Sequence, residues 1–300
     1  MVKDGQNPGE FALVWIEDAL SSGSICHDLG SPIHMFIKCI GYFCIAVVSS
    51  LTASAHEFWV APQTYIAQAG EPIAVGLKVG QMMKGADYPY LSDKFQSFTI
   101  TNRETTRNAE GVEGDIPALT FTAHEPGLHV IAFHAVPYPI TFDTFLEFYD
   151  YLAYEGLGDI GRIHKSRGLP EAGITERYIR YAKGLVQVGP ILAADIDRPL
   201  GLQFELIAEV NPYSPKLEAL PVSLVWQGKP VAGRQISIFN DNGAITRTLV
   251  TTDSEGRALI PLTSGGQYLL NAVHIEAVKD GEAMWESHWA SLTFGLPVRN

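Results

Sequence analysis

Five short runs decide the fold: EFWVAP at 57–62, IAVGLKVG at 73–80, KFQSFTIT at 94–101, ALTFTAHEPG at 118–127 and LHVIAFHAV at 128–136. Apolar and polar residues alternate in these runs, and turn-forming residues separate them. Such alternation is typical of strands that bury one face, and the short spacing between turns is typical of a β-sandwich. We therefore predict antiparallel strands from residue 56 to about residue 139.

Between residues 141 and 184 the spacing of the apolar residues changes. They recur every three or four positions at Phe142, Phe145, Leu146, Tyr149 and Leu152. The same spacing returns after Glu171 at Tyr178, Tyr181 and Leu185. Because this period places residues on one side of a helix, we expect an α-helical insertion at 141–184.

A Pro-rich break divides the remaining strand signals into two groups. The first predicted domain covers 56–212, and the break at Asn211–Pro215 marks its end. The second covers 213–300 and resembles the small Ig-like or transthyretin-like sandwiches of bacterial surface proteins, with turns such as Thr252–Gly256. The predicted fold class is mainly β, with two antiparallel β-sandwich domains and an α-helical insertion in or after the first.

Residues 35–55 have the layout of a secretory signal peptide. Lys38 lies near the start, an apolar run too short to span a membrane follows, and Ala-Ser-Ala ends the segment. We expect cleavage after Ala55 and a location in the periplasm or outside the cell. Residues 1–34 are net acidic and are interpreted as a misassigned N-terminal extension. All three cysteines precede residue 56, so the mature chain would form no disulfide.

The charge balance limits the classes of partner. The 300 residues include 33 acidic and 21 basic side chains, which give a net charge of −12. This composition lacks the basic surface of a nucleic-acid-binding protein, so cations are better partners. No nucleophile elbow, P-loop or dinucleotide-binding glycine pattern occurs, so we expect neither hydrolase chemistry nor a nucleotide partner. The basic run at 176–183 is interpreted as a solvated amphipathic helix rather than an anion-binding stripe.

His56 would become the first residue after cleavage at Ala55. An N-terminal His offers its α-amine and its imidazole Nδ1 to one metal ion, and one further His would complete a nitrogen-rich site. Such ligation suits Cu(II) or Ni(II). The competing interpretation is that His56 is first only by accident, and Glu57 could be an outer-sphere acceptor or a solvated charge.

The other mature histidines show no helical zinc-protease spacing, so any site must be assembled across strands. They are His124, His129, His134, His164, His274 and His288. His129 and His134 differ by five positions, which places them on opposite faces of a strand, and at least one is expected to be a core histidine. His274 lies late in an apolar strand and would be structural unless a second ligand faces it. His164 is expected to be exposed in a basic loop.

Several strings resemble a secreted bacterial family of unknown molecular function that is associated with nickel and cobalt uptake. They are AHEFW at 55–59, FYDYLAYEGL at 148–157, ERYIRYAK at 176–183, AVHI at 272–275 and WESHWASLTF at 285–294. The resemblance implies that His56 and His274 are family positions. Glu57 replaces the family's Asp, and His288 stands where an aromatic residue is expected, which puts its ligand role in doubt.

The sequence therefore predicts a non-catalytic protein that binds a divalent transition metal, Ni, Co or Cu, and assists nickel or cobalt uptake. The predicted ligands are His56 and His274, with His129 or His134 as a third. The expected partners are the metal ion and a membrane metal transporter. Two alternatives stay open: a copper-dependent redox enzyme that uses the N-terminal His and an exposed tryptophan surface, and a structural or adhesion protein.

Overall fold

The computed structural model describes residues 56–103, 105–263, 265–279, 281 and 283–297. The predicted signal peptide, the cleavage point, the N-terminal extension and the cysteines lie outside the described residues. The described chain is mainly β, as predicted, and its strands form three sheets.

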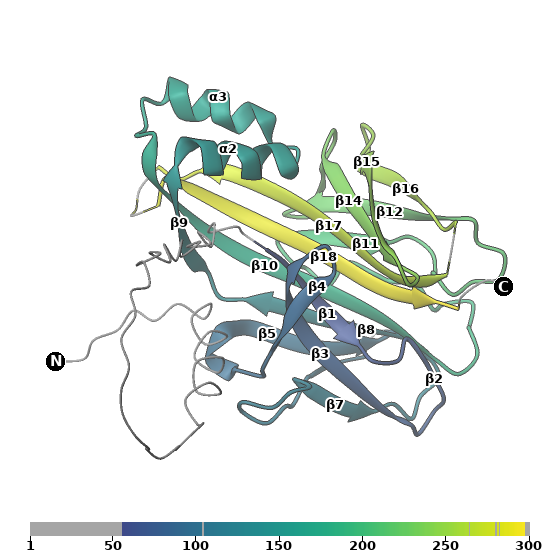
Figure 1. Cartoon of the computed structure of the whole chain (residues 1–300). Helices are drawn as coiled ribbons and strands as arrows, with labels where there is room; N and C mark the ends of the chain where they lie inside the picture. Colours follow the sequence, from purple (N-terminus) through teal and green to yellow (C-terminus); the bar gives the residue numbers. More distant parts are fainter. Residues whose placement is uncertain (1–55, 104, 264, 280, 282, 298–300) are drawn as a thin grey trace, which may run out of the picture. The chain divides into compact units, whose positions relative to one another are not determined.

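A ten-stranded sheet is the centre of the molecule, and we call it the central sheet (Figure 1). Its main path runs through β15 (Ile245–Thr251), β14 (Gln235–Asp241), β17 (Gly266–Ala277), β18 (Trp285–Leu296), β10 (Ala172–Val188), β8 (Gly127–Ala135), β5 (Phe95–Asn102) and β6 (Thr105–Asn108). Two further strands pair with β10: β2 (Ile66–Ala67) and β9 (Tyr138–Thr144). Most neighbours are antiparallel, but β10 runs parallel to β18 and to β2.

Two four-stranded sheets pack on the central sheet. The N-terminal sheet consists of β1 (Glu57–Pro62), β3 (Pro72–Gln81), β4 (Lys84–Tyr88) and β7 (Leu119–Thr122). The cover sheet consists of β11 (Phe204–Ala208), β12 (Ala219–Trp226), β13 (Lys229–Pro230) and β16 (Arg257–Pro261). A 3-10 turn at Ser92–Lys94 and two helices, α2 (Phe145–Tyr154) and α3 (Gly158–Ser166), complete the described elements.

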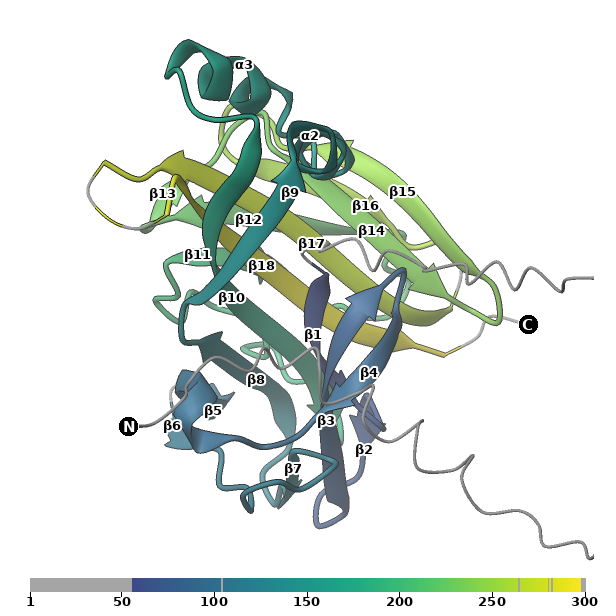
Figure 2. The ribbon, with the colours of Figure 1, turned by 60° about the vertical axis from the view of Figure 1, so that its left-hand side comes forward.

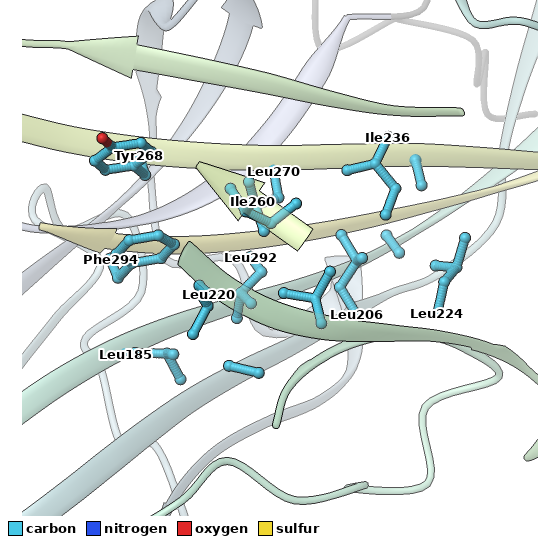
Figure 3. Close-up of a cluster of buried hydrophobic side chains, with 14 of the residues drawn as sticks. Leu185, Leu206, Leu220, Leu224, Ile236, Ile260, Tyr268, Leu270, Leu292 and Phe294 are labelled. Atoms are coloured by element: carbon cyan, nitrogen blue, oxygen red, sulfur yellow. The ribbon is translucent and has the colours of Figure 1, made fainter. Parts of the chain in front are cut away.

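The two faces of β10 bury different cores. Tyr181 and Leu185 point toward the cover sheet, where they join a cluster that includes Leu206 and Leu224 (Figure 3). Ala182 and Val186 point the other way, into the cluster shared with the N-terminal sheet. The helices cover the same side as the N-terminal sheet, above a third cluster that contains Trp285 and Trp289. Hydrophobic burial on both faces therefore fixes the central sheet as the middle layer.

The helical part of the chain is shorter than the predicted insertion. Helices occupy 145–154 and 158–166, whereas residues 172–188 form the long strand β10 (Figure 2). The prediction of a helix around Tyr178, Tyr181 and Leu185 is wrong because β10 is buried on both faces. Such a strand loses its period of two, and its apolar residues can imitate helical spacing.

The predicted domain boundary does not separate two sheets. It falls between β11 and β12, which pair with each other along five residues. The central sheet also combines strands from before and after residue 213, since β18 pairs with β10. The described chain thus contains two sheet-on-sheet packings that share one central sheet.

Candidate metal centre

Two imidazoles and two carboxylates face one another on the hairpin formed by β17 and β18. The strand register pairs His274 with His288 and Glu276 with Glu286. Because residues i and i+2 of a strand share a face, all four side chains project toward the same side. We call these four residues the histidine–glutamate cluster.

Three of these residues bring ligand atoms within 4.8 Å of one another: Glu276, Glu286 and His288. His288 Nε2 lies 3.3 Å from a Glu286 carboxylate oxygen, Oε1. His274 Nε2 lies 4.0 Å from Oε2 of Glu276. Imidazole nitrogens and carboxylate oxygens are common ligands of first-row transition metals, so the cluster offers a mixed nitrogen and oxygen site.

The exposure of the cluster to solvent increases from His288, which we call its base, to Glu276, which we call its rim. The side chain of His288 is fully buried, that of Glu286 is 14% exposed, and that of Glu276 is 48% exposed. His274, at 19%, lies between these extremes. Glu276 therefore lies at the solvent-exposed end of the cluster, and His288 lies at its buried end.

Two aromatic residues of the cover sheet, Trp226 and Phe204, pack against the imidazoles of the cluster, and we call them the aromatic wall. The Trp226 ring centroid lies 4.5 Å from that of His274 and 4.3 Å from that of His288. Phe204 packs against His274 at 5.9 Å. These rings remove water from the imidazoles, which strengthens electrostatic interactions within the site.

Two polar residues of β10, Tyr181 and Arg177, contact His288 and Glu286 of the cluster. The Tyr181 hydroxyl lies 3.1 Å from His288 Nδ1 and donates to Gln203 Oε1 at 3.2 Å. The Arg177 guanidinium donates to Oε2 of Glu286, which leaves Oε1 directed at His288. His134 packs on the Tyr181 ring at 4.7 Å.

Burial keeps both imidazoles neutral. Desolvation, helped by the neighbouring His274 and Arg177, lowers the pKa of His288 to about 3. Desolvation and the charge of Arg234 lower the pKa of His274 to about 4. Burial and the neighbouring Glu286 raise the pKa of Glu276. Neutral imidazoles are the form that binds metals.

Two buried imidazole nitrogens have no hydrogen-bond partner among the residues that the structure describes. They are Nε2 of His288 and Nδ1 of His274. The 3.3 Å approach of Nε2 to Glu286 lacks hydrogen-bond geometry. A buried polar atom without a partner costs free energy, so Nε2 is suited to a cation between the imidazole and the carboxylates.

The structure does not bring His56 to this cluster. His56 precedes β1, and Ser291 donates to the Phe58 carbonyl, so β1 lies over the face of β18 opposite to His288. Arg180 also lies on that side, and its guanidinium donates to the His56 carbonyl at 3.2 Å. His56 and His274 therefore project from opposite faces of the central sheet.

His129 and His134 lie on opposite faces of β8, as their spacing predicts. His129 packs beside Phe121 on the N-terminal side and has its pKa lowered mainly by burial. His134 lies on the side of the cluster, with Tyr181 between it and His288. It is thus a neighbour of the site, and the group of ligand atoms that lie within 4.8 Å of one another does not include it.

Two other sequence expectations are corrected. His164 is fully buried in α3 rather than exposed: it accepts from Trp285 Nε1 at 3.1 Å, and its Nε2 donates to the Pro170 carbonyl at 2.9 Å. Lys183 is also buried, in an ion pair with Asp197, rather than on a solvated helix. Both residues hold the core together.

Sequence reasoning does not identify Glu276 and Glu286, and it places the ligand role of His288 in doubt. The signal was present as two i, i+2 pairs, His-Ile-Glu at 274–276 and Glu-Ser-His at 286–288, on consecutive strands. Only the register shows that the two pairs face each other. The departure of His288 from an expected aromatic residue argues against a ligand role, whereas its distance of 3.3 Å from Glu286 supports one.

The fold and the cluster define a mainly β protein with a histidine–carboxylate site on the face of its central sheet. The chain belongs to a family described as a domain of unknown function (DUF4198), whose model matches residues 53–276. The match includes His274 and Glu276 and ends before Glu286. No curated protein matches the chain. Within the described residues, neither helix has the length and apolar character needed to cross a membrane.

Proposed function

We propose that the protein binds one divalent transition-metal ion at the histidine–glutamate cluster. The observation that carries the proposal is the fully buried Nε2 of His288, which faces the Glu286 carboxylate at 3.3 Å without a hydrogen bond. His288 and Glu286 would form the base of the site. Glu276 would close it from the rim, and His274 would supply a second imidazole.

The ligand types favour first-row metals of intermediate hardness. Imidazole suits Zn, Ni, Co and Cu, whereas carboxylates also accept harder ions, and thioether or thiolate ligands are absent from the cluster. Arg177 balances part of the negative charge of Glu286 and holds its second oxygen. The remaining carboxylate charge complements a divalent cation.

We further propose that the bound metal is nickel or cobalt and that the protein assists its uptake without catalysing a reaction. The resemblance to a family associated with nickel and cobalt uptake supports this role. The proposal includes export by the segment 35–55 and transfer of the ion to a membrane transporter. The rim position of Glu276 supports transfer because the ion would remain accessible from one side.

The copper redox alternative has less support. It requires a flat exposed aromatic surface near His56, but Trp59, Trp285 and Trp289 are each at most 3% exposed. Trp285 and Trp289 pack against residues of α2, and Trp59 packs against Phe239 and Leu269.

Calorimetric titration with Ni(II), Co(II), Cu(II) and Zn(II) tests the proposal. The wild-type chain should bind one ion, and His288→Asn and Glu286→Gln should each weaken binding by more than about 100-fold, since each removes a direct ligand. His124→Asn is a matched control because His124 is exposed and outside the cluster. Binding that is lost in His56→Asn and kept in His288→Asn would instead support the N-terminal site predicted from the sequence.

A further inference from the structure

We propose that Gln203 and Tyr181 form a hydrogen-bond relay that sets the tautomer of His288 and leaves the lone pair on Nε2. Both are positioning residues, because neither touches the place where the ion would lie. The role of the relay in metal binding rests on the metal site proposed above. The tautomer itself is a property of the metal-free protein.

The direction of the relay follows from the donors available to Tyr181. A phenol has one hydrogen and can give it to only one acceptor at a time. The hydroxyl is directed to Gln203 Oε1, 3.2 Å away, and an amide oxygen can only accept. The phenol oxygen is then free to accept a hydrogen from His288 Nδ1 at 3.1 Å. With its hydrogen on Nδ1, the neutral imidazole carries its lone pair on Nε2.

The opposite tautomer leaves polar groups unpaired. A hydrogen on Nε2 would be a fully buried donor, and Nε2 has no hydrogen-bond partner in the described part of the chain. Oε1 of Glu286 is 3.3 Å away but not in line with such a hydrogen. Tyr181 would also have to turn from Gln203 to His288. The tautomer with Nδ1–H pairs all three residues and so costs less free energy.

The relay joins the two sheets at the site. The ligands belong to β17 and β18 of the central sheet, whereas Gln203 immediately precedes β11 of the cover sheet. The Gln203 carbonyl accepts from the Gln227 backbone N–H at 2.7 Å, in the turn that follows Trp226. The cover sheet thus supplies both the aromatic wall and the acceptor that orients His288. Outer-shell partners of this type change metal affinity by about 10- to 100-fold.

Nitrogen-15 NMR of the histidine side chains in the metal-free, full-length protein at pH 7.5 tests the relay. His288→Asn identifies the His288 signals by their loss. Wild type should show a protonated Nδ1 and an unprotonated Nε2. Gln203→Leu should move the hydrogen to Nε2, because Tyr181 then donates to Nδ1. Gln203→Glu keeps an acceptor and should retain the wild-type tautomer. Gln267→Leu, on an exposed position of β17, is the control for the substitution.

A parallel Ni(II) titration separates this proposal from the previous one. We expect Gln203→Leu and Tyr181→Phe to weaken binding by about 10- to 100-fold. Gln203→Glu keeps the acceptor and adds a negative charge, so it should bind at least as tightly as wild type. A hydrogen on Nε2 in wild type, or an unchanged tautomer in Gln203→Leu, would overturn the relay. A wild-type protein with Nδ1–H that binds no metal would refute the proposed function and leave the relay standing.

Discussion

At the scale of single residues, burial removes the histidines of the cluster from the usual titration range. The pKa values of His274 and His288 fall to about 4 and about 3, mainly because burial penalises the charged imidazole. Protons therefore compete with a metal for these imidazoles only well below pH 6. In the unfolded chain the same groups titrate near 6.5, so their contribution to stability is present above that pH and is lost as pH falls.

The lowered pKa values of His274 and His288 predict that metal affinity changes little with pH. Between pH 7.5 and 6.0 the Ni(II) dissociation constant should change by less than about threefold, because neither imidazole takes up a proton there. Competition titrations with a chromophoric chelator at several pH values measure it. A steep loss of affinity through pH 6.5 would point to solvent-exposed histidine ligands and against the cluster.

Glu176 should have the opposite effect on stability from the histidines, because it makes the fold less stable as pH rises. Its carboxyl is buried beside Ser287 and Tyr151, and burial raises its pKa to about 7. A raised carboxyl pKa stabilises the fold below about pH 4.5, and this contribution is lost as pH rises through 7. We expect Glu176→Gln to flatten the decline of stability between pH 5 and 8.

Urea unfolding at pH 5, 6, 7 and 8 checks this expectation. In wild type, each buried carboxyl with a raised pKa increases the unfolding equilibrium constant by up to about tenfold per pH unit. Glu176→Gln should remove the contribution of Glu176 to this pH dependence. Glu218→Gln, at an exposed position, is the control and should leave the slope unchanged. Equal slopes in wild type and Glu176→Gln would show that Glu176 is ionised in the fold.

At the scale of secondary-structure elements, the start of α2 depends on one cap. Thr144 is the N-cap, and its hydroxyl accepts from the Glu147 N–H at 3.2 Å. We expect Thr144→Ala to lower the free energy of unfolding by about 1 kcal/mol, since a backbone donor loses its partner. Thr144→Ser keeps the hydroxyl, so urea denaturation should show it close to wild type. A loss of equal size in both variants would contradict the cap.

The strands that bury one face were predictable, and the strands that bury two were not. The run at 57–62 became β1 and the run at 73–80 lies within β3, because their alternation reports a single buried face. In β10 the residues from 181 to 188 are all buried, so the pattern contains no period of two. The spacing of Tyr178, Tyr181 and Leu185 imitates a helix, but Tyr178 packs on the helix side of the central sheet and the other two pack on the cover-sheet side.

The histidine–glutamate cluster depends on strand register, which a single sequence does not contain. The sequence indicates that His274 needs a second ligand on its own face, and the hairpin places His288 there. The pairing of His56 with His274 required knowledge of which side of the central sheet β1 covers. That choice is made by packing of Phe58 and Val60 against distant strands, not by local sequence.

At the scale of the whole molecule, a buried ion network joins the central sheet to the cover sheet. Lys183 of β10 is 1% exposed, and its Nζ lies 2.7 Å from the Asp197 carboxylate and 3.0 Å from that of Glu205 in β11. Lys183→Met would leave two buried carboxylates without their cation. We expect a loss of about 3–5 kcal/mol in the free energy of unfolding.

Chemical denaturation of Lys183→Met beside Lys78→Met measures this loss. Lys78 makes a partly exposed ion pair with Asp87 at 2.8 Å, so its removal should cost no more than about 1 kcal/mol. Similar small losses in both variants would mean that the Lys183 network contributes little to holding the sheets together.

The shared central sheet also explains why composition and turn signals could not give the arrangement of the sheets. The Pro-rich break at Asn211–Pro215 is a real interruption between β11 and β12, but the chain returns to pair β12 with β11. Long-range pairing of β18 with β10 then joins the C-terminal strands to the N-terminal ones. Neither pairing leaves a local mark in the sequence.

The most direct test of the account is the position of a bound metal in the full-length protein. Crystals grown with Zn(II) and measured at the zinc absorption edge should show one anomalous peak about 2.1 Å from His288 Nε2, with Glu286, Glu276 and His274 as further ligands. A peak at His56 on the opposite face of the central sheet, or no peak at the cluster at saturating Zn(II), would contradict the account.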